Sequence, residues 1–245
     1  MEIAYENRIL PITGGYNFRD LGGIVTGDQK TIKPNLLIRT DEMSNLTETD
    51  LDLLASLNVK TIVDFRTEEE RKTSKDKKPS TCEYEFHLDI MAANMNAFLE
   101  KIQNGNSDFK TMMNDFYTDL VTSKNGILEY RNFFSILQNP KYNGIVYHCT
   151  AGKDRTGIAT ALILSALKVN WNIIEEDYLL SNNFLAKKYE HYIAEKPSLA
   201  DIFLVNAEYL QNAFEVIEHK YYSVEDFLVD ILHIDLDLMK IIYTH

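Results

Sequence analysis

The chain has 245 residues, of which 45% are hydrophobic, so it is long and apolar enough to bury a substantial core. Its formal net charge of −12 disfavours nucleic acid as a partner, because an acidic surface repels a polyanion. No apolar run is long enough to predict a transmembrane helix, and the two cysteines, Cys82 and Cys149, favour a reducing compartment over a disulfide framework. We therefore expect a cytoplasmic protein. The N-terminus does not resemble a signal peptide, although a leader removed beforehand would allow secretion.

The first clear helix is predicted directly after Thr47. Thr47 and Asp50 have the spacing of a capping box, with Asp in place of the usual Glu or Gln. Leucines at helical spacing follow, and Asn58 is the expected end of the helix.

Two strands are predicted next. Residues 61–64 form a short apolar run that ends at Asp64, and residues 84–90 alternate between apolar and polar side chains. Between them, residues 72–80 are the most polar stretch of the chain, and we expect them to form a solvated surface loop.

The second half of the sequence is rich in predicted helix. Residues 91–138 have a mostly helical pattern with breaks near 104–105 and 125–126, a strand is predicted over 144–148, and helix dominates from Arg155 onward. Helices and strands that alternate in this way predict an α/β fold. No composition shift or linker divides the chain, so we expect a single domain over residues 1–245.

The most informative stretch runs from His148 to Gly157. Cys149 stands six residues before Arg155, and Thr156 follows the arginine directly. Strand-forming residues precede the stretch and helix-forming residues follow it. A compact loop between a strand and a helix N-terminus directs backbone N–H groups and partial positive charge toward a bound anion. The stretch therefore predicts a phosphate-binding loop.

Each residue type in this loop has a role in cleaving a phosphate monoester. A helix N-terminus and a cation stabilise a thiolate, so Cys149 is the expected nucleophile. The planar fork of Arg155 can hold two phosphate oxygens, and the hydroxyl of Thr156 can donate to the thiolate. His148 is expected to hold the loop, and Lys153 to add a second cation at its rim.

The backbone N–H groups of Thr150, Ala151 and Gly152 would complete the phosphate site. A nucleotide-binding P-loop is excluded, because Lys153 is followed by Asp154 and Tyr147 stands where that motif requires glycine. A lone cysteine is more often a small buried apolar residue. The spacing and the flanking elements together favour catalysis.

The motif resembles the Cys-x5-Arg-Ser/Thr signature of the protein tyrosine phosphatase superfamily. Its form here, Ala-Gly-Lys-Asp-Arg-Thr-Gly, is similar to that of a bacterial tyrosine phosphatase family with mycobacterial and listerial members. The resemblance extends from about Gly14 to at least Asn182. Four further blocks carry it: Asn17–Gly23, Leu37–Asp41 with Leu46 and Thr47 after it, Val63–Thr67, and Asp177–Asn182.

This resemblance implies one tyrosine-phosphatase-like catalytic domain, with a central, mostly parallel sheet flanked by helices. It implies a phosphomonoesterase that forms a phosphocysteine intermediate and needs no metal or other cofactor. The implied substrates are phosphotyrosine proteins, with phosphoserine and phosphothreonine proteins as further candidates. Lys153, Asp154 and Arg155 also resemble the lipid phosphatases of the superfamily, which adds phosphoinositides.

The general acid is less defined than the nucleophile. Many superfamily members carry it in a Trp-Pro-Asp loop, but the single tryptophan here, Trp171, follows the motif and precedes Asn172. Asp64 is the first candidate, since it ends a strand as Cys149 does, and Asp154 is the second. Asp20 is a weaker third. Each also has a structural interpretation: Asp64 could only orient Arg66, and Asp20 could pin a turn before two glycines.

Two other classes of protein remain open from the residues alone. Rhodanese-like and arsenate-reducing enzymes also place a cysteine and an arginine in an anion loop. A phosphate-binding module without catalysis is the second alternative, which the intact Cys149, Arg155 and Thr156 disfavour. Cys82 could form a protective disulfide with an oxidised Cys149, but a spectator role is the stronger expectation.

Overall fold

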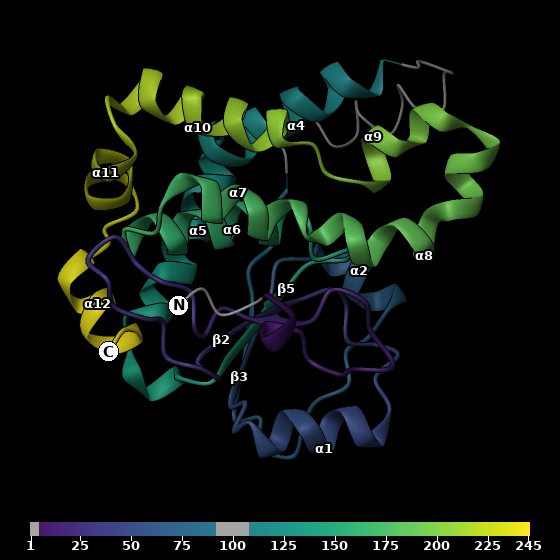
Figure 1. Ribbon diagram of the computed structural model, residues 1–245, viewed down its shortest axis with the longest axis horizontal. Helices are drawn as coiled ribbons and strands as arrows, with labels where there is room; N and C mark the ends of the chain where they lie inside the picture. The colour runs from purple at the N-terminus through teal and green to yellow at the C-terminus, as the bar shows by residue number, and fades with distance from the viewer. Residues whose placement is uncertain (1–4, 92–107) are drawn as a thin grey trace.

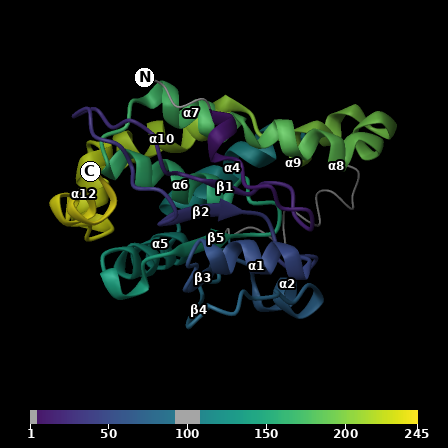
Figure 2. The ribbon, with the colours of Figure 1, turned by 60° about the horizontal axis from the view of Figure 1, so that its bottom comes forward.

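In the computed structural model, which describes residues 5–91 and 108–245, a five-stranded sheet has the order β1-β2-β5-β3-β4. Only β1 is antiparallel to its neighbour, and the other pairs are parallel. Figure 2 shows the strands in this order. The sheet confirms the predicted α/β fold. The strands are β1 (Arg19–Asp20), β2 (Leu37–Thr40), β3 (Thr61–Asp64), β4 (Tyr84–His87) and β5 (Ile145–His148).

Helices cover both faces of the sheet and make up most of the second half of the chain, as the sequence predicts (Figure 1). The longer ones are α1 (Glu48–Ser56), α2 (Glu68–Thr73), α4 (Phe109–Thr122), α5 (Lys124–Leu137), α6 (Arg155–Ala166), α7 (Trp171–Leu179), α8 (Ser181–Glu195), α10 (Ala207–Tyr221) and α12 (Leu236–Tyr243). Short helical segments are η1 (Tyr5–Arg8), η2 (Pro140–Tyr142), η3 (Pro197–Leu199), α9 (Ala200–Phe203), α11 (Val224–Asp226) and the π-helix η4 (Phe227–Ile231). Within the described ranges, no helix is long and apolar enough to cross a membrane.

The two faces of the sheet belong to separate hydrophobic cores. Val63 and Tyr147 pack into the large core beneath α4, α5, α6 and α10, and Cys149 joins them there. Ile62 and Val146 pack into the smaller core beneath α1. Because side chains alternate along a strand, the ends of β3 and β5 present their side chains to these two faces in turn. This alternation decides which residues can meet at the site.

Local sequence signals account for several element boundaries. Thr47 and Asp50 form the predicted capping box of α1, and Asn58 adopts a positive φ of 58° just beyond the helix end. A second capping box, which the sequence analysis did not identify, starts α2: Thr67 accepts from the backbone of Glu70, and the Glu70 carboxylate accepts from the backbone of Thr67.

Some predicted boundaries are wrong. The strand predicted over 84–90 ends at His87. The break predicted near 125–126 lies at Ser123, which ends α4 and caps α5, so that Gly126 lies within the helix. The predicted break near 104–105 falls outside the described residues.

Candidate active site

The loop between β5 and α6 connects Cys149, at the end of the strand, to Arg155, the first residue of the helix. Gly152 adopts a positive φ of 66°, and a Cβ there would lie 2.2 Å from the carbonyl oxygen of Thr40. Only glycine fits this close approach without strain. The predicted strand, compact loop and helix N-terminus are therefore all present.

The guanidinium of Arg155 forms a two-pronged ion pair with Glu70 of α2. Its two terminal nitrogens each donate to a Glu70 oxygen at 2.8 Å, and Nη1 also donates to the carbonyl of Phe65 at 3.3 Å. Burial by itself raises the pKa of Glu70, but Arg155, Thr150 and the Thr67 N–H outweigh it and lower the pKa to about 2. Glu70 therefore stays ionised and fixes the plane of the arginine fork.

The back of the loop is fixed by two side chains from the N-terminal segment and β2. The amide of Asn17 donates to the carbonyls of Ala151 and Gly152 at 3.2 and 3.0 Å, and Arg39 Nη2 donates to the Gly152 carbonyl at 2.9 Å. With these carbonyls turned into the protein, the loop can present backbone N–H groups on its other side. This gives a physical role to the Asn17–Gly23 and Leu37–Asp41 blocks.

A buried cluster, here called the Asp177 cluster, supports this arrangement. The Asp177 carboxylate of α7 contacts Arg8 at 2.9 Å, Arg19 at 3.2 Å and Arg39 at 2.8 Å. Burial raises the pKa of Asp177, but the three guanidiniums together lower it well below its usual range. Burial and Arg39 lower the pKa of Arg19 to about 10, against the opposite effect of Asp177. Asp177 and Arg19 thus form a charged pair at neutral pH.

A second buried cluster, the Arg66 cluster, lies under the other side of the loop. Arg66 Nη2 donates to Asp64 at 2.9 Å and to Asp76 at 2.6 Å, and Nη1 lies 3.5 Å from Glu42. Asp76 belongs to the polar stretch 72–80, which was expected to be only a solvated surface loop. That expectation is wrong at this position, because Asp76 reaches inward and is largely buried.

His148 joins this second cluster directly behind Cys149. Its Nδ1 lies 3.1 Å from the Cys149 carbonyl oxygen, and its Nε2 lies 3.1 Å from Asp76 Oδ2 and 3.9 Å from Asp64 Oδ1. Burial disfavours the charged imidazolium, but the two carboxylates outweigh it and raise the pKa of His148 to about 9. His148 therefore holds the base of the loop as a buried cation.

Asp64, Asp76 and His148 also offer three possible metal-ligand atoms within 4.8 Å of one another. Arg66 already donates to both carboxylates, and the protonated His148 supplies a second positive charge. The charge of the carboxylates is thus balanced by the chain's own cations, so this donor set is poorly suited to a metal ion.

The structure places the three candidate acids in different surroundings. Asp64 lies on the α1 side of the sheet, beside His148, and binds Arg66 through both oxygens, as its structural interpretation predicted. Asp20 accepts from the backbone of Gly22 at 3.0 Å and of Asn35 at 2.7 Å, so it pins a turn. Both carboxylates therefore already accept hydrogen bonds through both of their oxygens.

Asp154, in contrast, stands in the loop itself as the residue before α6. Its Oδ1 accepts from Tyr117 and from Lys153, each at 2.7 Å, and its side chain remains 17% exposed. Tyr117 in turn contacts the hydroxyl of Tyr178 at 2.6 Å. Lys153 is buried and paired with Asp154, so its role as a second cation for the substrate stays a prediction.

Two further predicted residues have distinct surroundings. The hydroxyl of Thr156 is fully buried and has no hydrogen-bond partner among the described residues, so its hydrogen bond is free to be donated. Cys82 packs against the core beneath α1, whereas Cys149 lies in the core beneath α6. Both are free thiols. The sheet separates them, which disfavours the protective disulfide.

Comparison with known proteins identifies the family. The model of the tyrosine phosphatase family matches residues 10–244. The chain belongs to this family. A protein of Cupriavidus necator that is named for tyrosine-protein phosphatase activity is 27% identical over 91% of this chain and 84% of its own length. Triple specificity protein phosphatase PtpB of Mycobacterium tuberculosis is 27% identical over 89% of this chain and 92% of its own length. A tyrosine-protein phosphatase of Nostoc commune is 27% identical over 63% of this chain and 51% of its own length.

Membership of this family confirms the resemblance found in the sequence and the predicted enzyme class, a phosphoric monoester hydrolase of the tyrosine phosphatase type. It disfavours both alternatives, the sulfur-transfer or arsenate-reducing enzyme and the inert phosphate-binding module.

Proposed function

We propose that this tyrosine phosphatase works through Cys149, Arg155 and Thr156, with Asp154 as the general acid. The observation that carries the proposal is the position of Arg155. Arg155 is the first residue of α6 and its guanidinium is held by Glu70, while Cys149 directly follows the last residue of β5. A phosphate in the loop would meet the thiolate at the strand end, the fork at the helix start and the backbone N–H groups between them.

The reaction then proceeds in two steps. In the first, the Cys149 thiolate attacks phosphorus, a P–S bond forms, the P–O bond to the leaving group breaks, and Asp154 gives its proton to the departing oxygen. In the second, the Asp154 carboxylate takes a proton from water as the water oxygen attacks phosphorus. The P–S bond breaks, inorganic phosphate leaves and the thiolate is restored. Thr156 would donate a hydrogen bond to the departing sulfur.

Asp154 is our choice of acid because it is the candidate in the loop. Its Tyr117 and Lys153 contacts both use Oδ1, and its side chain keeps access to solvent. Asp64, which the sequence ranked first, is bound through both oxygens by Arg66 and lies on the α1 side of the sheet. A proton donor must reach the leaving oxygen, and Asp154 is the better placed of the two.

Phosphotyrosine proteins are the substrates we propose first, since the family and two relatives are named for that activity. The mycobacterial relative is named a triple specificity protein phosphatase, which supports a substrate range wider than phosphotyrosine. As further substrates we propose phosphoserine and phosphothreonine proteins and, from the resemblance of residues 153–155 to lipid phosphatases, phosphoinositides. We also propose the cytoplasm as its location, because both cysteines are free thiols.

The nucleophile is tested with Cys149→Ser. We expect turnover of para-nitrophenyl phosphate to be abolished while binding of a phosphotyrosine peptide is kept, because a serine hydroxyl stays protonated and the rest of the loop is intact. Cys82→Ser is the matched control and should retain activity. Both are assayed with a chelator present. Activity of the Cys149→Ser variant within about tenfold of the parent would contradict the thiolate mechanism.

The acid is tested by comparing Asp154→Asn with Asp64→Asn on two substrates. Para-nitrophenolate leaves without a proton, whereas the phenolate of tyrosine needs one. We expect Asp154→Asn to reduce phosphotyrosine peptide hydrolysis by about 10²–10⁴-fold and para-nitrophenyl phosphate hydrolysis far less. Asp64→Asn should affect both substrates alike. If the leaving-group dependence appeared only in Asp64→Asn, the assignment would be reversed.

A further inference from the structure

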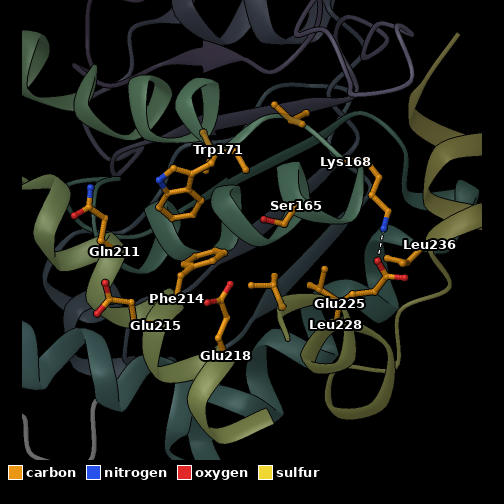
Figure 3. Close-up of a pocket in the computed structure, with 13 residues that line it drawn as sticks. Ser165, Lys168, Trp171, Gln211, Phe214, Glu215, Glu218, Glu225, Leu228 and Leu236 are labelled. Carbon is orange, nitrogen blue, oxygen red and sulfur yellow. Dashed lines mark hydrogen bonds and ion pairs between the residues drawn. The ribbon is translucent and has the colours of Figure 1, made fainter. Parts of the chain in front are cut away.

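A pocket of about 470 Å³ lies at the far end of α6 from the catalytic loop (Figure 3). Arg155 begins this helix and Ser165, near its end, lines the pocket, a separation of about 15 Å along a helix axis. The remaining walls come from α7, α10, α11, the π-helix η4 and the start of α12. No step of the proposed reaction uses this pocket.

Two aromatic rings form an apolar surface inside the pocket. Trp171 begins α7 and Phe214 lies on α10, and their ring centroids are 4.9 Å apart at an interplanar angle of 59°. Figure 3 shows the two rings next to each other on the pocket wall. Ile174 and Leu228 extend the apolar lining. A pocket of this size with aromatic walls is typical of small-molecule sites.

Carboxylates line the same pocket beside the aromatic rings. Glu215 and Glu218 flank Phe214 on α10, and neither has an ion-pair partner among the described residues. The one lysine in the lining, Lys168, is paired with Glu225, as the dashed line in Figure 3 marks. The four charged residues of the lining therefore leave two uncompensated negative charges, both on α10.

We propose that this pocket binds a small organic cation, an ammonium or guanidinium group attached to an apolar or aromatic body. The body would pack against Trp171 and Phe214, while the cation would approach the Glu215 and Glu218 carboxylates. Indole faces also attract cations directly. The net charge of −12 favours the approach of a cation over that of an anion. The proposal is independent of the residues assigned to catalysis.

Trp171 makes the proposal directly measurable, because it is the only tryptophan in the chain. Its fluorescence is followed while three ligands of similar shape are added: phenylbutylamine, the neutral phenylbutanol and the anionic phenylbutyrate. We expect a saturable change with the amine, at least about tenfold weaker binding of the alcohol, and no saturation with the carboxylate. Added salt should weaken binding of the amine. Equal binding of the amine and the alcohol would overturn the proposal.

Variants then locate the site, with calorimetry on the full-length chain as a second readout. The double variant Glu215→Gln with Glu218→Gln should weaken binding of the amine at least about tenfold and leave binding of the alcohol unchanged. The matched control, Glu48→Gln with Asp52→Asn, removes two exposed carboxylates from α1 and should leave the affinity unchanged. Trp171→Leu should weaken binding of both the amine and the alcohol. Unaltered amine binding in the α10 double variant would reject the proposal.

Discussion

The two buried charge clusters beside the catalytic loop have opposite compositions. In the Asp177 cluster one carboxylate is shared by three guanidiniums, whereas in the Arg66 cluster one guanidinium is shared by three carboxylates. The first cluster reaches the loop through Arg39, which donates to the Gly152 carbonyl. The second reaches it through His148, which lies against the Cys149 carbonyl.

The loop is therefore held from its two sides by different kinds of contact. The Asp177 cluster has three guanidiniums to one carboxylate and fixes the loop through Arg39. The Arg66 cluster carries excess negative charge, and its contact with the loop is a histidine whose pKa of about 9 depends on neighbouring carboxylates. The first side should be nearly independent of pH, and the second should respond to it.

The largest expected effect comes from breaking the first cluster. Asp177→Asn leaves Arg8, Arg19 and Arg39 buried without their shared anion, so we expect a loss of about 3–5 kcal/mol in the free energy of unfolding. Urea denaturation measures it. Glu176→Gln, an exposed neighbour on α7, is the control and should change stability by less than about 0.5 kcal/mol. If Asp177→Asn lowered the free energy of unfolding as little as the control does, the three arginines would not be held by Asp177.

A smaller, pH-dependent effect is expected from the second cluster. Asp76→Asn removes the carboxylate nearest to His148. The pKa of His148 is raised from 6.5 to about 9 on folding, so the resulting stability is fully present below about pH 6.5 and lost as pH rises through about 9. The free energy of unfolding of the parent should exceed that of the variant by on the order of 3 kcal/mol near pH 6, and this difference should become smaller toward pH 10.

The Asp76→Asn experiment is read from denaturant unfolding at several pH values. Arg66 keeps its ion pairs with Asp64 and Glu42 in the variant. The part of the difference in unfolding free energy that comes from Arg66 should therefore not vary over this pH range. A gap that stays constant from pH 6 to pH 10 would show that His148 does not titrate through Asp76.

The smallest effect concerns Glu70, which bridges from α2 to Arg155. Its pKa is lowered from 4.5 to about 2, so its contribution is present above about pH 4.5 and lost as pH falls through about 2. The Glu70 side chain is 31% exposed, and solvent screening reduces its contribution to on the order of 1 kcal/mol. Glu70→Gln should lower the unfolding free energy by that amount at neutral pH, and the difference should disappear in acid.

Glu69→Gln is the control for this comparison, since Glu69 is an exposed neighbour on the same helix. Parallel stability curves for the parent and Glu70→Gln down to about pH 2 would contradict the ion pair with Arg155. Such a result would also remove the observation on which the orientation of the arginine fork depends.

The parts of the site that the sequence predicted are those encoded locally. Cys149, Arg155 and Thr156 lie within eight consecutive positions between a strand and a helix, so their spacing alone indicates an anion loop. The Thr47 capping box and the end of β3 at Asp64 were also predicted, because the signals lie within a few residues of each other.

The long-range partners could not be predicted in this way. Arg39 and Asp177 are 138 positions apart, and Glu70 and Arg155 are 85 apart. Nothing local indicates which carboxylate a buried guanidinium will meet. For Asp64 the missing information was the strand register, which places its side chain on the α1 side of the sheet beside His148. The helix that presents Glu70 was not predicted, although the Thr-x-x-Glu pattern that starts at Thr67 is a local signal that could have indicated it.

Helix α6 is buried on nearly every side, since all its residues from Thr156 to Leu164 lie in the interior. Substitutions along it therefore disturb core packing before they alter the substrate site. Changes that adjust which phosphate ester is accepted are accordingly better tolerated on α2 and α8, whose outer faces are exposed. A library designed to alter substrate preference would keep α6 and Glu70 constant and vary the exposed positions of those two helices.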